Sequence, residues 1–145
     1  MQTRRPNMST TDVVRQEVEA LKRHSLADMT DRYTEDAVVH DPMYSEPLRG
    51  REAIRDDLAA WLRTFPDLEV EMRAILEEGD RYACEIAMTG THKGPLITPD
   101  GELAPSGKRV AMSIGLFGRL DGDRIAEERR YYDLSSIAAQ LATTH

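Results

Sequence analysis

Hydrophobic positions in the first half of the chain follow the spacing of helices. Three stretches carry apolar residues three or four positions apart with polar residues between them, which is the pattern of an amphipathic helix. The sequence therefore predicts helices over residues 11–25, 26–33 and 50–65. A short β-like run at 37–40 lies between the second and third helices. It ends at the Asp-Pro pair that follows.

After Pro66 the period of the pattern changes from 3.6 residues to two, which indicates half-buried strands. Turn signals at 78–80 and 121–123 predict two hairpins, and the stretch 93–107, rich in Pro and Gly, predicts a long loop. The strands expected on this basis are 68–73, 81–92, 108–120 and 124–133. Ser135 is expected to cap a short closing helix that reaches Leu141.

This order of elements, helices first and then a meander of antiparallel strands, is typical of an α+β fold with helices on one face of a curved sheet. Strands and helices do not alternate along the chain, so a doubly wound sheet is not expected. A chain of 145 residues has the length of one domain. A domain of this size buries roughly 68–70% of the surface that the unfolded chain exposes. We expect a flexible leader over residues 1–9 and a single domain over 10–145.

Composition narrows the class of protein. Hydrophobic residues make up 40% and charged residues 31% of the chain, which is too apolar for a disordered chain and too polar for a membrane protein. The net charge of −7 argues against nucleic acid or an anionic membrane as the main partner. The basic N-terminus lacks the apolar stretch of a secretory signal. The single cysteine, Cys84, excludes an internal disulfide and a multi-thiolate metal site. We therefore expect a cytoplasmic protein.

The last long strand carries most of the candidate chemistry. Alternation places Glu127, Arg129, Tyr131 and Asp133 on the same face as Ile125, and because Ile125 reads as a core residue, we expect this face to point inward. Buried charges are costly unless they are paired, so the row predicts either a salt-bridge ladder or a polar pocket. Asp133, at the end of the strand, is the candidate general acid or base. The alternative is a solvated, salt-bridged surface or a dimer interface.

Other side chains are weaker candidates. His40, at the edge of the short strand, is the second candidate for proton transfer, although a lone histidine is more often structural. Metal binding has little support, because His40 and Asp41 are adjacent and point to opposite sides of a strand, and no clustered Cys and His spacing occurs. Methionines such as Met88 and Met112, on successive strands, would suit an adaptable apolar cavity.

Several short motifs, each weak alone, occur in an order and spacing that resemble one family. They are Asp36–Pro42, Arg49–Ile54, Gly90–Gly94, Pro105–Lys108, Asp121–Glu127, Tyr132–Leu134 and Gln140-Leu141. Together they resemble the SnoaL-like polyketide cyclases, over roughly residues 11–141. That family belongs to the nuclear-transport-factor-2-like superfamily, which also contains ketosteroid isomerases.

The resemblance implies a cone-shaped α+β fold, in which a curved antiparallel sheet wraps around the N-terminal helices and encloses a deep pocket. The resemblance also implies a homodimer or larger oligomer, and a reaction that needs no metal and no organic cofactor. In the family's cyclases a pocket aspartate acts as general acid and base in an intramolecular aldol closure. By its place before the closing helix Asp133 matches that aspartate, and His40 matches a pocket-facing position.

The function expected from these features is a cofactor-free, polyketide-cyclase-like enzyme that acts on a hydrophobic carbonyl compound by acid/base catalysis. The catalytic residues expected are Asp133 and His40, and Arg129 or His40 would stabilise the enolate oxygen. The substrate-binding residues expected are Arg129, Tyr33, Trp61, Met88, Met112 and Tyr131. The alternatives are a binding or dimerisation module without turnover, or an isomerase or epoxide hydrolase of the same superfamily.

Overall fold

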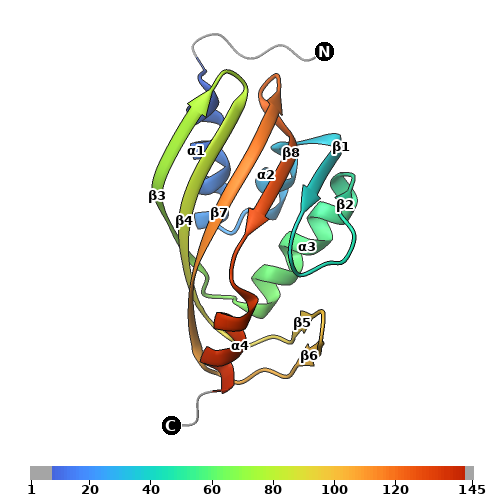
Figure 1. Ribbon diagram of the computed structural model, residues 1–145, viewed down its shortest axis with the longest axis vertical. Coiled ribbons are helices and arrows are strands. Elements are labelled where there is room, and N and C mark those ends of the chain that lie inside the picture. Colours follow the sequence, from blue (N-terminus) through green and yellow to red (C-terminus); the bar gives the residue numbers. More distant parts are fainter. Residues whose placement is uncertain (1–7, 143–145) are drawn as a thin grey trace.

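The computed structural model describes residues 8–142, which form four helices and eight strands (Figure 1). In chain order they are α1 Thr10–Lys22, α2 Leu26–Asp31, β1 Tyr33–His40, β2 Leu48–Arg49, α3 Arg51–Thr64, β3 Glu69–Glu78, β4 Arg81–Thr91, β5 Leu96–Thr98, β6 Gly101–Leu103, β7 Arg109–Asp121, β8 Arg124–Tyr131 and α4 Leu134–Ala142. Six strands form one sheet in the order β2-β1-β8-β7-β4-β3, and β5 and β6 form a separate hairpin.

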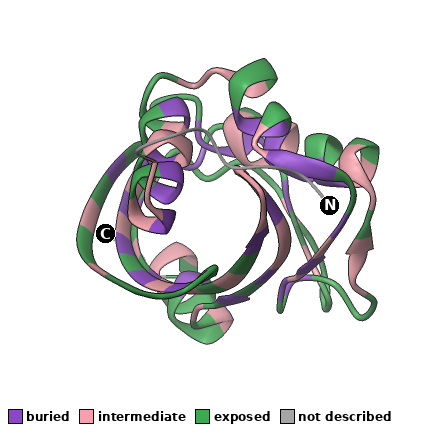
Figure 2. Ribbon diagram, turned by 90° about the horizontal axis from the view of Figure 1, so that it is seen from above, coloured by how far each residue is buried: buried purple, intermediate pink, exposed green. Residues whose placement is uncertain are grey.

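The large sheet curls around three helices, and its concave side faces α1, α2 and α3 (Figure 2). The helices bury the faces that their periodicity predicts. In α1 the buried apolar residues are Val13, Val14, Val18 and Ala20. A capping box starts this helix, because the Ser9 side chain accepts from the backbone N–H of Asp12 while the Asp12 carboxylate accepts from that of Ser9. The core therefore lies between the helices and the concave face.

The predicted α+β class and curved sheet are confirmed, with differences in detail. Helix α2 ends at Asp31, and β1 begins at Tyr33 rather than at residue 37. Strand β1 pairs in parallel with β8, so the sheet is antiparallel except at this one pair. The predicted loop 93–107 contains the β5–β6 hairpin. Of the predicted leader, residues 1–7 lie outside the described residues, whereas Ser9 belongs to the cap of α1.

One irregularity changes which side of β8 points inward. Ile125 pairs with Leu120 and Glu127 pairs with Arg119, so Ala126 is an extra residue without a partner on β7, as in a β-bulge. Such a residue shifts the side-chain alternation by one position. Ile125 is buried as expected, but the buried charged residues that follow it are Glu128 and Arg130.

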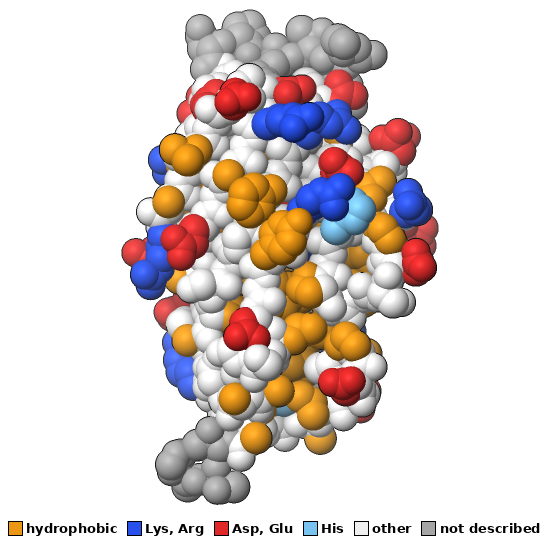
Figure 3. Space-filling model, viewed as in Figure 1, with side chains coloured by type: hydrophobic (Ala, Val, Ile, Leu, Met, Phe, Trp, Pro, Cys, Tyr) orange, Lys and Arg blue, Asp and Glu red, His pale blue; other side chains and the backbone are white. Residues whose placement is uncertain are grey.

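The inward placement predicted for Glu127, Arg129 and Tyr131 is therefore wrong. These residues lie on the outer side of the sheet and are partly or largely exposed. Figure 3 shows that this outer surface carries hydrophobic and charged side chains next to one another.

Candidate functional site

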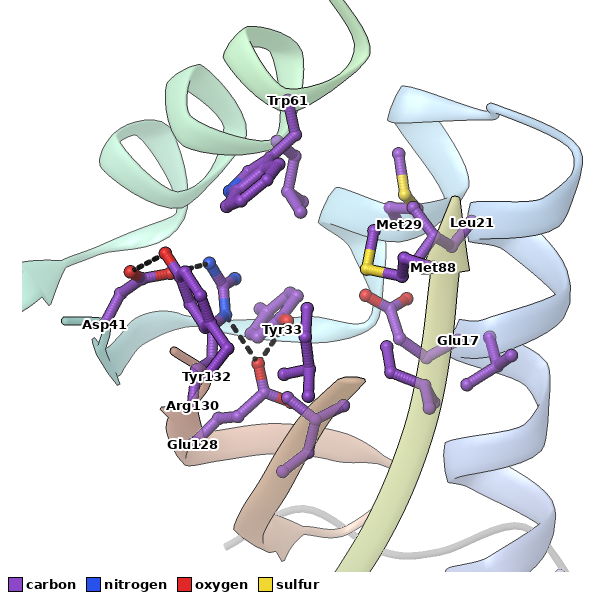
Figure 4. Close-up of a pocket in the computed structure, with 15 residues that line it drawn as sticks. Glu17, Leu21, Met29, Tyr33, Asp41, Trp61, Met88, Glu128, Arg130 and Tyr132 are labelled. Atoms are coloured by element: carbon purple, nitrogen blue, oxygen red, sulfur yellow. Dashed lines mark hydrogen bonds and ion pairs between the residues drawn. The ribbon is translucent and has the colours of Figure 1, made fainter. Parts of the chain in front are cut away.

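A pocket lies between the three N-terminal helices and the concave face of the sheet (Figure 4). Its apolar wall consists of Val18, Leu21, Met29, Leu58, Trp61, Ile86, Met88, Ile114 and Leu116, and its polar residues are Glu17, Tyr33, Asp41, Glu128, Arg130 and Tyr132. The cavity has a volume of about 70 Å³, against the roughly 10–15 Å³ that one water requires. A polycyclic ligand would therefore have to displace flexible side chains such as Met29 and Met88.

Arg130 is the centre of the polar side of the pocket. Its Nη1 lies 3.0 Å from Asp41 Oδ2 and 2.6 Å from Asp57 Oδ2, and its Nε lies 3.3 Å from Glu128 Oε2. Burial alone would lower the pKa of Arg130, but Asp57, Tyr33, Glu128 and Asp41 together hold it above its ordinary value. Three carboxylates surround one guanidinium, so the cluster carries two formal negative charges in excess.

Glu128 accepts hydrogen bonds from two tyrosines as well as from Arg130. The Tyr33 hydroxyl donates to Oε2 at 2.9 Å and the Tyr82 hydroxyl donates to Oε1 at 2.8 Å. Burial, and next to it the charge of Glu128, raise the pKa of both hydroxyls, so they stay protonated as donors. Three donors thus fix the position of the Glu128 carboxyl group.

Asp41 is fixed in a similar way at the end of β1. Its Oδ1 accepts from the backbone N–H of Met43 at 2.8 Å and from the Tyr132 hydroxyl at 2.5 Å. Burial, followed by the charge of Asp41, raises the pKa of Tyr132. The ring of Tyr132 meets that of Trp61 edge to face, with centroids 5.8 Å apart. The polar cluster is thus anchored to the aromatic part of the pocket.

Of the side chains predicted to bind substrate, three line this pocket. They are Tyr33 from β1, Trp61 from α3 and Met88 from β4. Trp61 and Met88 lie on the faces that the periodicity predicts, whereas Tyr33 begins a strand instead of ending the predicted helix. Their part in binding remains a proposal.

Asp133 does not line the pocket, contrary to the prediction. It is exposed after the end of β8, where its Oδ1 accepts from the Ser135 hydroxyl at 2.6 Å and from two backbone N–H groups at the start of α4. Those hydrogen bonds, first the one from the Ser135 side chain and then the one from the Ser136 backbone, lower the pKa of Asp133. The alternation shifts at Ala126 and β8 ends at Tyr131, so a residue predicted to face the interior caps a helix.

The other predicted site residues also lie elsewhere. His40 Nε2 is 3.5 Å from Glu127 Oε2, and Arg129 Nη2 is 3.7 Å from the same oxygen, so these three form a cluster on the outer face. Tyr131 packs on Phe117 there, with ring centroids 5.7 Å apart. Met112 lines a separate, more open hollow that also includes Asp133. The expected roles of these residues in the pocket do not fit these positions.

Sequence reasoning missed the charged residues of the pocket and of the cluster around Arg130. Glu17 and Asp57 each interrupt the apolar stripe of a helix: Glu17 lies three positions after Val14, and Asp57 lies three after Ile54. A charged residue on the stripe of an amphipathic helix is a signal that could have found both. No comparable signal marks Glu128 and Arg130, because one extra residue in the strand decides their direction.

Two further observations concern only the described residues, 8–142. In that range no group of three or more His, Cys, Asp or Glu side chains has the arrangement of a metal site. No helix there is both long enough and apolar enough to cross a membrane.

The sequence matches the family described as SnoaL-like polyketide cyclase over residues 11–141. No curated protein matches it closely enough to count as a relative. Similar solved structures include IdmH from Streptomyces antibioticus, a proposed polyketide cyclase, with 24% identity and a TM-score of 0.78 over 94% of this chain and 100% of that one.

Two other similar structures have different descriptions. AclR from Streptomyces galilaeus, a proposed hydroxylase, has 24% identity and a TM-score of 0.76 over 91% of this chain and 80% of that one. A ketosteroid isomerase-like protein from Catenulispora acidiphila, solved with trimethylamine, has 21% identity and a TM-score of 0.76 over 94% and 96%. At these identities the likeness shows the fold alone.

Proposed function

The chain belongs to the family of SnoaL-like polyketide cyclases, and from this premise we propose that it is a cofactor-free enzyme that closes a ring in a hydrophobic carbonyl compound by acid/base catalysis. The observation that carries the proposal is the composition of the pocket. An apolar wall of aliphatic and aromatic side chains faces two carboxylates, Glu128 and Asp41, which Arg130 and tyrosine hydroxyls hold in place.

The reaction proposed is an intramolecular aldol closure. Glu128 takes a proton from the carbon next to a carbonyl group, and the resulting enolate carbon forms a bond to a second carbonyl carbon. The oxygen of that second carbonyl gains the electron pair of its broken π bond and takes up a proton. General acid and base groups contribute about 10²–10⁴-fold to such steps, and the apolar wall contributes by holding the two ends of the substrate together.

The geometry of Arg130 also favours a second candidate, epoxide hydrolysis. One guanidinium nitrogen contacts both Asp41 and Asp57, and an arginine held between two carboxylates could position a water next to a carboxylate that accepts its proton. A third possibility is a pocket that binds a small molecule without turnover, since one fold serves many functions.

A ligand screen followed by mass analysis tests the proposal. The panel contains polyketide esters, polycyclic ketones, sterols and epoxides, and a ligand at 100 times its Kd raises the stability by about 2.7 kcal/mol. Ring closure by aldol addition gives a product of unchanged mass and different retention, whereas epoxide hydrolysis adds one water. We expect the wild type and Glu127→Gln to form the isomer and Glu128→Gln to lose at least 10²-fold in rate. Binding without any product would contradict the proposal.

Assembly is a separate proposal. We propose a homodimer or larger oligomer, as the family resemblance implies. Exposed apolar side chains on the outer face of the sheet, among them Leu76, Phe117 and Tyr131, support it because such residues are common at protein interfaces. Sedimentation equilibrium of the wild type and of Phe117→Glu tests it: we expect dissociation in the variant, and a monomeric wild type would contradict the proposal.

A further inference from the structure

One carboxyl group of the pocket has no role in the cluster around Arg130. Glu17, on α1, projects toward the space between Met88 and Tyr33 (Figure 4). Its Oε1 is completely covered and has no hydrogen-bond partner among the residues that the structure describes. A buried polar oxygen without a partner is costly, and this one lies in the wall of a cavity that is open to a ligand.

The charges around Glu17 decide its protonation state. Glu128 and Arg130 face it from β8, Tyr33 faces it from β1, and Arg32 lies just before that strand. Burial raises the pKa of Glu17 most, and the negative charge of Glu128 raises it further. Arg130, Arg32 and the nearby Tyr33 side chain act in the opposite direction without cancelling the rise. Because the Arg130 cluster already holds two excess negative charges, a further carboxylate here is disfavoured and the neutral acid is favoured.

We propose that Glu17 is a catalytic proton donor, whose carboxylic acid O–H binds the carbonyl oxygen of the substrate and protonates it. Its reaction rests on the function proposed above, with Glu128 as the base. The pocket thus holds two carboxyl groups in different surroundings: Glu128 accepts hydrogen bonds from Arg130 and two tyrosines, whereas Oε1 of Glu17 has no partner among the described residues. Surroundings that differ in this way can divide the roles of acid and base between two carboxyl groups.

In a simple ketone, Glu128 removes a proton from the carbon next to the carbonyl, and the C–H electron pair becomes the new C=C bond. The π pair of the C=O bond moves to oxygen, which takes the proton of Glu17, so the products are an enol, a Glu17 carboxylate and a protonated Glu128. In the ring closure Glu17 serves the accepting carbonyl in the same way. Return of the proton from Glu128 to Glu17 restores the resting state.

This assignment also names the class of ligand. The group that meets Glu17 must accept a hydrogen bond from an acid and carry no negative charge, because an anion would add to the excess already present around Arg130. A neutral ketone, aldehyde or ester fits, and a free carboxylate does not. Leu21, Met29 and Met88 also line this pocket, and a hydrogen bond is stronger in such apolar surroundings than in water.

Hydrogen exchange of 2-tetralone in D2O tests the proposal, since proton removal from this enolisable ketone is visible by NMR without ring closure. We expect wild type to speed the exchange and Glu17→Gln to slow it by about 10²-fold, with a smaller change in KM, because the amide can donate a hydrogen bond but has no acidic proton to give. Glu19→Gln is the matched control, on the same helix with its side chain 58% exposed, and should keep the wild-type rate. Rapid exchange by Glu17→Gln alongside slow exchange by Glu128→Gln would overturn the role of Glu17 and leave the proposed function standing.

A second readout needs no turnover. Infrared difference spectra of wild type against Glu17→Gln at neutral pH should show the C=O band of a protonated carboxylic acid, and the carbonyl band of bound 2-tetralone should lie at lower frequency in wild type than in Glu17→Leu. Absence of exchange in wild type together with both bands would count against the proposed function and support Glu17 as an acid that binds the carbonyl. A carboxylate band for Glu17 would overturn the proposal whatever the exchange rates.

Discussion

Removal of the positive charge from Arg130 should be the most damaging single substitution in the polar cluster. Arg130→Gln leaves the carboxylates of Asp41, Asp57 and Glu128 without their shared cation. Their side chains are 0%, 2% and 4% exposed, so water cannot take its place. The matched control is Arg129→Gln, which changes the neighbouring residue on the opposite face of the same strand.

The two substitutions should differ strongly in cost. Removal of one partner from a buried ion pair costs about 3–5 kcal/mol, and here one arginine serves three carboxylates. Arg129 has a side chain that is 48% exposed and lies 3.7 Å from Glu127 in an ion pair, and exposed pairs of this kind contribute about 0–1 kcal/mol. We therefore expect Arg130→Gln to lose at least 3 kcal/mol in the free energy of unfolding and Arg129→Gln to lose less than 1 kcal/mol.

Urea denaturation, followed by the fluorescence of Trp61, measures both. Trp61 is the single tryptophan of the chain and lies in the pocket wall. Lowering the pH protonates the unpaired carboxylates of Arg130→Gln, so part of the lost stability should return on acidification, and Arg130→Lys should be intermediate at neutral pH. If Arg129→Gln costs as much as Arg130→Gln, the bulge at Ala126 and the inward direction of Arg130 are wrong.

Three further outcomes follow from other parts of the structure. Gly118→Ala should be clearly destabilising in urea denaturation, because a Cβ there would lie 2.3 Å from the Tyr82 ring, whereas at Gly115 the nearest atom is 3.6 Å away and alanine should be tolerated; equal costs would contradict this packing. Burial raises the pKa of Cys84 to about 12, so iodoacetamide at neutral pH should alkylate it at the rate of unfolding, and fast alkylation of the native protein would contradict its burial. Glu17 has a pKa raised above its ordinary value of 4.5, so wild type should lose stability as the pH rises from there toward the raised pKa, by up to about 1.4 kcal/mol per pH unit relative to Glu17→Gln; parallel pH–stability curves would show that Glu17 is charged.

The fold could be predicted because its signals are local. The change of period at Pro66 separates the helices from the sheet, and the turns at 78–80 and 121–123 set two of the hairpins. Long-range pairing has no such signal: the parallel contact between β1 and β8 joins segments almost ninety residues apart, and the start of β1 at Tyr33 depends on that pairing.

The candidate site is harder to predict, because one residue decides which side chains of β8 point into the pocket. Strict alternation from Ile125 selects Glu127, Arg129 and Asp133, and the unpaired Ala126 selects Glu128, Arg130 and Tyr132 instead. The sequence of β8 is charged on both faces, so neither hydrophobicity nor charge distinguishes the two directions. In helix α3, by contrast, Trp61 lies on the predicted apolar stripe and lines the pocket.

The rates at which wild type, Glu128→Gln and Asp133→Asn turn over one substrate from the ligand screen decide whether the reaction takes place in the pocket around Arg130. The structure predicts that Glu128→Gln loses at least 10²-fold while Asp133→Asn, which changes an exposed helix cap, stays within a few-fold of wild type. Loss of turnover in Asp133→Asn with an active Glu128→Gln would contradict the account, because the chemistry would then lie outside the pocket around Arg130.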